Sequence, residues 1–171
     1  LREHLNKFTN SASCLLFATG TLALRSALLL LDLEPGSGIA IPSYTCPDLL
    51  TATLTAGLGP VVIDCDATGL LDADKVAEAH QRGEVSAAVA VHQFGLLNLS
   101  MQPLTALMPV IEDCCHVPPK AYLQGSRAVF GSLEGTKLLG AGEGGYLLLH
   151  DLPSLAPHDT SLLGNRLSDL V

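Results

Sequence analysis

Residues 14–42 read CLLFATGTLALRSALLLLDLEPGSGIAIP, an apolar run, a helical pattern and a second apolar run in that order. The first run, 14–20, predicts a strand that ends in a small-residue turn. Residues 21–33 predict a helix that "EPGSG" stops with proline and glycine, and 39–42 predict a buried strand. A strand, a helix and a strand in this order are typical of a parallel sheet.

The same alternation continues along the rest of the chain. We expect helices at 47–57, 72–83 and 102–108 and strands at 60–66, 86–95, 109–115, 128–133 and 144–150. The strands are almost continuously apolar, which indicates a sheet covered on both faces. The last two strands are joined through a glycine turn, so we expect a mixed sheet. The sequence therefore predicts an α/β fold with three αβα layers around a mostly parallel, mixed sheet.

The composition limits the class of protein. The 171 residues suffice for one domain, and hydrophobic residues make up 48% and charged residues 15% of them. A typical domain has about 25% charged residues, so this chain buries more surface than usual or offers some to a partner. The net charge of −8 argues against nucleic acid and against an anionic membrane as partners. The leucine-rich stretch 15–33 contains Arg25 and Asp32, so we interpret it as strand, turn and helix rather than a membrane span.

The cysteines indicate a reducing compartment. Their number is odd and their spacing is not that of a zinc site; they are Cys14, Cys46, Cys65, Cys114 and Cys115. We expect reduced thiols, with the adjacent pair as packed small residues. The polar, helical start LREHLNKF does not resemble a signal peptide, so we expect a cytoplasmic protein.

Ligands of an open α/β sheet bind beyond the carboxyl ends of its strands, and several polar residues follow predicted strands. Gly20 and Thr21 lie between a strand and a helix, where backbone N–H groups and the helix dipole can hold an anion. The alternative is an ordinary turn with a threonine N-cap. Tyr44 or Cys46 could face a ring bound at the end of the second strand. The alternative for Tyr44 is half-buried packing.

An acid and a base follow the later strands. Asp113 ends an apolar strand and could hold a protonated ring nitrogen, with His116 three residues on. The alternatives are a helix cap or surface pair for Asp113 and a loop histidine for His116. Lys137 follows Ser132 after another strand and could form an imine with a carbonyl, although a solvated lysine is the usual case. An anion site, an acid for a ring nitrogen and an imine-forming lysine together predict a pyridoxal phosphate (PLP) site.

The sequence resembles the DegT/DnrJ/StrS sugar aminotransferases, which have the aspartate-aminotransferase-like PLP fold. The resemblance runs from residue 1 to about 151. Its most specific piece is TKLLGAGEGG (136–145), which follows Ser132. It is carried by GTLALRSALLLL (20–31), PGSGIAIPSYT (35–45), AGLGPVVIDCD (56–66), AVAVHQFG (88–95), VIEDCCH (110–116) and GSLEGTKLLGAGEGGYLLLHD (131–151).

The resemblance implies a role for each candidate residue. Lys137 matches the lysine that binds the cofactor aldehyde as an imine, and Asp113 matches the partner of the pyridine nitrogen. Thr21 and Leu22 match residues that bind the phosphate through backbone N–H groups, next to Gly20. Ser132 matches a further phosphate ligand, and His116 matches a polar residue that faces the ring oxygen. Cys46 stands where the family usually has an aromatic residue on the pyridine ring.

The resemblance also implies an activity and a domain organisation. We expect residues 1–151 to form the PLP-binding large domain and 152–171 a linker or helix, with the family's C-terminal small domain absent. The implied activity is amino transfer to a keto-sugar nucleotide by a homodimer. The alternative is a truncated, non-catalytic homologue that binds PLP or a partner chain. Sugar dehydration is less favoured, because relatives that dehydrate have histidine where Lys137 stands.

Overall fold

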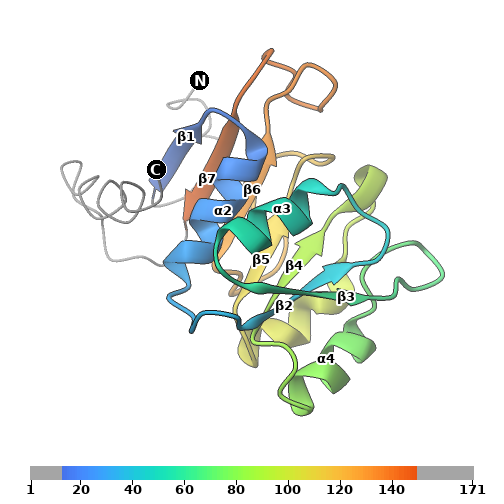
Figure 1. Ribbon diagram of the computed structural model, residues 1–171. Helices are drawn as coiled ribbons and strands as arrows, with labels where there is room; N and C mark the ends of the chain where they lie inside the picture. The colour runs from blue at the N-terminus through green and yellow to red at the C-terminus, as the bar shows by residue number, and fades with distance from the viewer. Residues whose placement is uncertain (1–12, 150–171) are drawn as a thin grey trace.

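The computed structural model describes residues 13–149, which form one seven-stranded sheet between helices (Figure 1). The helices are α2 (Gly20–Leu30), α3 (Asp48–Thr55), α4 (Ala73–Gln81) and the 3₁₀ segments η1 (Gln93–Gly95) and η2 (Leu99–Ala106). The strands are β1 (Ser13–Phe17), β2 (Gly38–Pro42), β3 (Gly59–Ile63), β4 (Ala87–Val91), β5 (Val110–Asp113), β6 (Ala128–Ser132) and β7 (Gly145–Leu149).

The sheet is mixed, and six of its seven strands run in the same direction. The strand order is β1-β7-β6-β5-β4-β2-β3. β7 is antiparallel to both of its neighbours, β1 and β6, and the remaining neighbouring pairs are parallel. The carboxyl ends of β1, β2, β4, β5 and β6 therefore lie along one edge, where β7 begins. The predicted mostly parallel, mixed sheet is confirmed.

Helices cover the two faces of the sheet. α2 and α3 lie on one face, and α4 and η2 lie on the other (Figure 1). Leu24 and Leu28 of α2, four residues apart and 1% exposed, pack on the sheet beside small alanines. Burying a leucine side chain contributes about 1.5–3 kcal/mol, so this stripe fixes α2 on the sheet. On the other face, Val76 of α4 and Met101 of η2 belong to a second core. The three αβα layers are confirmed.

Some predicted elements have different ends. The helix expected at 102–108 is the 3₁₀ segment η2, which contains Pro103, a residue without an N–H for a helical ladder. The strand expected at 86–95 ends at Val91, because Phe94 takes a positive φ that a strand cannot continue. The predicted helical start and the tail at 152–171 lie outside the described residues.

The leucine-rich stretch 15–33 divides as predicted between β1 and α2. No helix within residues 13–149 is long and apolar enough to cross a membrane. Arg25, in the middle of α2, donates from Nε to the carbonyl of Thr55 at the end of α3 and so joins the two helices.

Cys46, Cys65, Cys114 and Cys115 are free thiols. Cys114 is 2% exposed and packs in an apolar cluster with Val129 and Tyr146, as expected for a small core residue. Burial raises the pKa of the Cys114 thiol and that of the neighbouring Cys115 thiol, so both remain protonated at neutral pH. Neither is a reactive thiolate.

Because residue 131 is glycine, the Tyr146 side chain of β7 can reach the end of β5. It lies opposite Tyr146 in the β6–β7 register, and Tyr146 is 1% exposed. The Tyr146 hydroxyl donates to the carbonyl of Cys114 over 3.2 Å, just beyond the end of β5. A Cβ atom on Gly131 would overlap the ring and the hydroxyl of Tyr146. Glycine at this position therefore supports the strand ends around Asp113.

We expect Gly131→Ala to lower the free energy of unfolding by about 1–3 kcal/mol, because the added methyl group overpacks a rigid core. Urea denaturation measures the change. Gly135→Ala is the matched control, since a Cβ there meets nothing within 4 Å, and its effect should stay within about 0.5 kcal/mol. Equal effects of the two substitutions would contradict this account of Gly131.

Candidate active site

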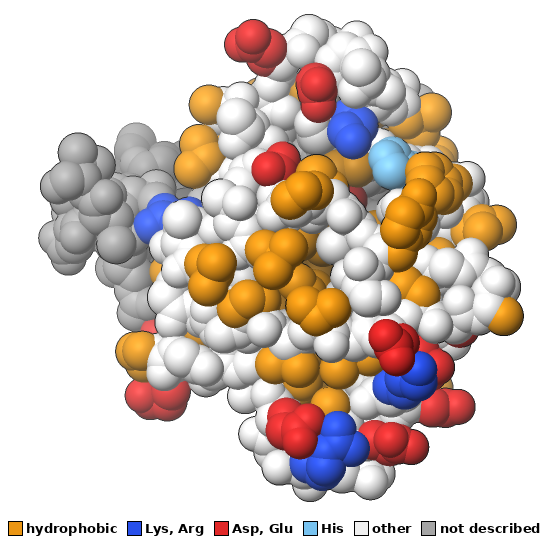
Figure 2. All heavy atoms as spheres, turned by 45° about the vertical axis from the view of Figure 1, so that its right-hand side comes forward, with side chains coloured by type: hydrophobic (Ala, Val, Ile, Leu, Met, Phe, Trp, Pro, Cys, Tyr) orange, Lys and Arg blue, Asp and Glu red, His pale blue; other side chains and the backbone are white. Residues whose placement is uncertain are grey.

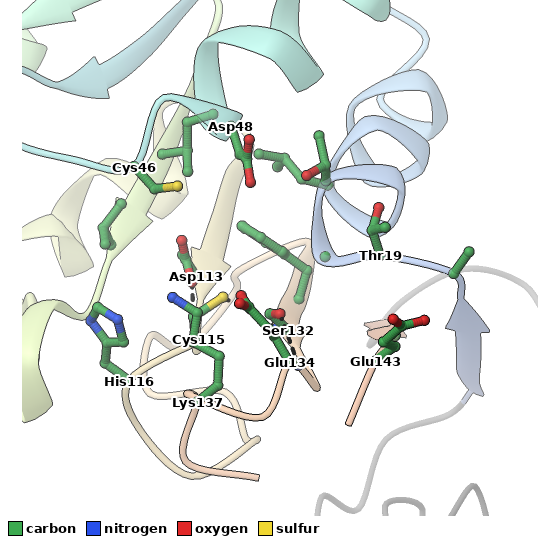
Figure 3. Close-up of a pocket in the computed structure, with 18 of the residues that line it drawn as sticks. Thr19, Cys46, Asp48, Asp113, Cys115, His116, Ser132, Glu134, Lys137 and Glu143 are labelled. Atoms are coloured by element: carbon green, nitrogen blue, oxygen red, sulfur yellow. Dashed lines mark hydrogen bonds between the residues drawn. The ribbon is translucent and has the colours of Figure 1, made fainter. Parts of the chain in front are cut away.

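A pocket of about 460 Å³ lies at the edge of the sheet where the parallel strands end (Figure 3). The segments that follow β1, β2, β4, β5 and β6 contribute to its wall, as does the segment that leads into β7. Seven of the eight residues that the sequence suggests for the site line this pocket. They are Gly20, Thr21, Cys46, Asp113, His116, Ser132 and Lys137.

Among these eight residues, Leu22 is the one that does not line the pocket. Its backbone N–H donates to Oγ1 of Thr19 over 3.1 Å, and its side chain is 41% exposed. The N-cap of α2 is therefore Thr19 and not Thr21, because Thr19 is extended and the helix begins at Gly20. Thr19 also lines the pocket, and the sequence argument missed it.

The start of α2 forms one end of the pocket. A Cβ on Gly20 would lie 3.0 Å from Cβ of Ser132, so glycine brings the first turn of the helix against β6. Within residues 13–149, neither the N–H nor the hydroxyl of Thr21 has a hydrogen-bond partner. Donors with no other partner, at the positive end of an eleven-residue helix, provide a site for an anion such as a phosphate group.

Asp113 ends β5 and forms a buried wall of the pocket. It is 5% exposed, and its Oδ1 accepts a hydrogen bond of 2.9 Å from the N–H of Cys115. Burial raises the pKa of the Asp113 carboxyl group, although the Cys115 hydrogen bonds and the nearby His116 and His92 act in the opposite direction. Among the described residues it forms no ion pair. A carboxylate in this position favours a cationic ligand atom.

Lys137 lies in the connection between β6 and β7, and its side chain points into the pocket toward Asp113 and Cys115 (Figure 3). Its backbone N–H donates to the carbonyl of Glu134 over 2.9 Å, and its carbonyl accepts from Gly140 over 2.9 Å. A Cβ on Gly140 would lie only 2.9 Å from the carbonyl of Gly135, which explains part of the glycine content of this connection. The half-buried Lys137 amine has no hydrogen bond or ion pair within 13–149.

His116 and Cys46 line the pocket near its opening. Nδ1 of His116 accepts a hydrogen bond of 3.3 Å from the N–H of Phe94, whose ring is stacked on the imidazole. Cys46 is exposed. Tyr44 is 59% exposed and does not line the pocket, so the half-buried packing considered for it is wrong. The sequence argument missed Phe94, because its contact with His116 joins two loops.

Acidic residues outnumber basic ones in the wall of the pocket. Besides Asp113, three exposed carboxylates line it, which we call the acidic rim: Asp48, Glu134 and Glu143. Lys137 is the one lysine or arginine among the lining residues. The sequence argument missed the acidic rim, although Glu134 and Glu143 lie in the same glycine-rich run as Lys137. An anion at the start of α2 would depend on backbone and hydroxyl donors rather than on arginine.

Comparison with known proteins shows similarity to enzymes that transfer amino groups. The chain is 31% identical over 159 residues to L-glutamine:scyllo-inosose aminotransferase from Streptomyces griseus, covering 84% of this chain and 36% of the relative. It is 30% identical over 143 residues to GDP-perosamine synthase from Caulobacter vibrioides, covering 77% of this chain and 38% of the relative. The chain thus spans little more than a third of the length of these two relatives.

Solved structures show the same fold. The crystal structure of 3-amino-5-hydroxybenzoic acid synthase matches with a TM-score of 0.76 and 25% identity, over 97% of this chain and 44% of the other. That of NtdA from Bacillus subtilis, with bound cofactor PMP, matches with a TM-score of 0.79 and 24% identity, over 88% of this chain and 36% of the other.

The family model that matches the chain covers nearly all of it. It is described as the DegT/DnrJ/EryC1/StrS aminotransferase family, and it spans residues 1–161. The match includes every strand of the sheet and every residue of the pocket wall. The chain therefore belongs to the DegT/DnrJ/EryC1/StrS aminotransferase family.

Proposed function

We propose that this chain forms the cofactor-binding part of a PLP-dependent aminotransferase. The observation that carries the proposal is that the Lys137 amine, the Asp113 carboxylate and the start of α2 face one pocket of about 460 Å³. These groups fit the three ends of PLP. A helix start with Thr21 donors suits the phosphate, a buried carboxylate without a cation suits a protonated pyridine nitrogen, and an amine without a partner suits the aldehyde.

PLP supplies, when bound, an aldehyde that condenses with amines and a ring that accepts an electron pair. The Lys137 amine would hold the cofactor by its aldehyde and, once free, would carry a proton to and from the substrate carbon. Asp113 holds the proton on the ring nitrogen, because its own buried charge is best balanced by a cation there. Thr21 and Ser132 orient the phosphate end, and His116 faces the ring.

The alternative of a non-catalytic homologue is less well supported. A homologue that binds only a partner chain needs neither an amine nor a buried carboxylate at the pocket, whereas Lys137 and Asp113 both line it. Cys46 stacks on a ring less well than an aromatic residue does, so we expect weaker cofactor binding rather than none. Tyr44, Phe94 and Leu96 are exposed, and Figure 2 shows hydrophobic side chains gathered on one face of the molecule. Both observations support the proposal of a homodimer.

We propose a keto-sugar as the amino acceptor, carried on a nucleotide as the resemblance implies. The name of the relative GDP-perosamine synthase supports this substrate. A second candidate is an uncharged polyhydroxy ketone, as in the name of the scyllo-inosose aminotransferase. The acidic rim favours this second candidate, because three carboxylates without an arginine repel a diphosphate.

The attachment of PLP to Lys137 can be tested by borohydride reduction in the presence of PLP, followed by peptide mass spectrometry. We expect the label on Lys137 and no label at this site in Lys137→Ala, whose amine transfer should fall by at least about 10²-fold. Lys120→Ala is the matched control, since Nζ of Lys120 lies 4.9 Å from the centre of the Tyr122 ring, outside the pocket wall. A folded wild-type chain without any label would support the non-catalytic homologue instead.

Asp113→Asn should stabilise the cofactor-free chain at neutral pH and weaken PLP binding. Since burial raises the pKa of Asp113 above its ordinary 3.8, the folded state holds the proton more tightly, and stability is lost as pH rises through the folded-state pKa. In urea denaturation, the free energy of unfolding of Asp113→Asn should therefore exceed that of the wild type at about pH 8, and the difference should shrink toward about pH 4. Asp74→Asn, on the exposed first turn of α4, is the control and should show no gain. A loss of stability for Asp113→Asn at both pH values would contradict this prediction.

The acidic rim makes a testable distinction between the two substrates. If the acceptor carries a diphosphate, Glu134→Gln and Glu143→Gln should raise kcat/KM about two- to fivefold at low ionic strength, because a repulsive charge is removed. For an uncharged ketone, kcat/KM should not change. Glu78→Gln on α4 is exposed and does not line the pocket, so it is the control for net charge. Activity with only the nucleotide-linked substrate would exclude the second candidate.

A further inference from the structure

Phe94 has a backbone conformation that is unfavourable for a bulky side chain. Its φ is 51° and its ψ 32°, in the left-handed region. The next residue, Gly95, has φ 84°, and the N–H of Leu96 donates to the carbonyl of Gln93 over 2.8 Å. Positive φ at both central positions is the pattern of a type I′ turn, in which asparagine, aspartate or glycine is preferred where phenylalanine stands here.

Burial does not compensate for this strain, because Phe94 is 68% exposed. Its contacts are with His116. The Phe94 N–H donates to Nδ1 of His116 over 3.3 Å, and the two rings are stacked with centroids 5.6 Å apart and an angle of 9° between their planes. Tyr44 lies on the same aromatic cluster, with its ring 6.1 Å from that of Phe94. The strained turn thus aims both an N–H group and a ring at one imidazole that lines the pocket.

The hydrogen bond from Phe94 determines which nitrogen of His116 carries the proton. Because Nδ1 accepts the Phe94 N–H, a neutral imidazole must have its proton on Nε2. Nε2 has no hydrogen-bond partner within residues 13–149. The ring therefore offers one donor to a ligand, and its plane is fixed by stacking.

We propose that Phe94 is a positioning residue that holds His116 as a fixed Nε2–H donor for an acceptor oxygen of the ligand in the pocket. The inference rests on the proposed function for the identity of that ligand, the ring of PLP. Phe94 does not line the pocket and acts through His116. The strained turn places the Phe94 ring and N–H against the imidazole.

Phe94→Asn separates this role from a structural one, because it creates the Asn-Gly pair that a type I′ turn prefers. The thermal midpoint should stay unchanged or rise, while the dissociation constant for PLP, measured by absorbance titration, should increase about two- to tenfold with the loss of the stacked pair. Phe94→Tyr keeps the stacking and should bind as the wild type does. Leu107→Asn, an apolar position of similar exposure (59%) outside the pocket wall, is the control and should leave the dissociation constant unchanged.

A second measurement needs no cofactor. In the 171-residue chain with ¹⁵N-labelled histidine, at about pH 8.5 where histidine is ordinarily neutral, the His116 signals should report the Nε2–H form, assigned with His116→Gln. Phe94→Asn keeps the turn and its N–H donor, so the Nε2–H form should persist, but the His116 ring signals should shift because the stacked Phe94 ring is lost. A lower thermal midpoint with unchanged His116 signals and unchanged PLP affinity would show that Phe94 is only structural. If the wild type binds no PLP, the proposed function fails, and the His116 signals still decide the role of Phe94.

Discussion

The close contact between the first turn of α2 and the adjoining ends of β6 and β7 determines the geometry of the whole pocket. Gly20 meets Ser132 of β6, where a Cβ would lie 3.0 Å from the serine Cβ. Gly145 begins β7 against the carbonyl of Thr19, which any side chain at position 145 would overlap. Because both sides of this contact are glycine, the positive end of the helix reaches the edge of the sheet where the parallel strands end.

The pocket brings together hydrogen-bond donors, a buried carboxylate and an amine. Thr21 offers donors at the start of α2, Asp113 provides a buried carboxylate, and the Lys137 side chain points toward Asp113. Within residues 13–149, neither the Thr21 donors nor the Lys137 amine has a partner. A buried carboxylate next to a pocket destabilises the empty chain and stabilises a complex with a cationic ring. The same carboxylate therefore lowers the stability of the empty chain and strengthens the binding of a cationic ring.

One of the two strained non-glycine positions lies at this edge of the sheet. Within residues 13–149, Phe94 and Asp32 are the two non-glycine residues with positive φ, and Phe94 is the one that contacts a residue of the pocket wall. Local strain persists only where the surrounding contacts determine the conformation, and here stacking on His116 supplies them.

The sequence by itself determined the layers of the fold and the chemical groups of the site. Apolar runs and helical patterns are local, so the strands and the position of Lys137 after β6 could be predicted from them. The tertiary structure alone decided which groups meet. Thr19 rather than Thr21 caps α2, because the pairing of β1 with β7 ends before it. Phe94 and His116 are 22 residues apart, and only the parallel alignment of β4 with β5 brings their loops together. Contacts across strands depend on register and loop geometry, which local sequence patterns do not encode.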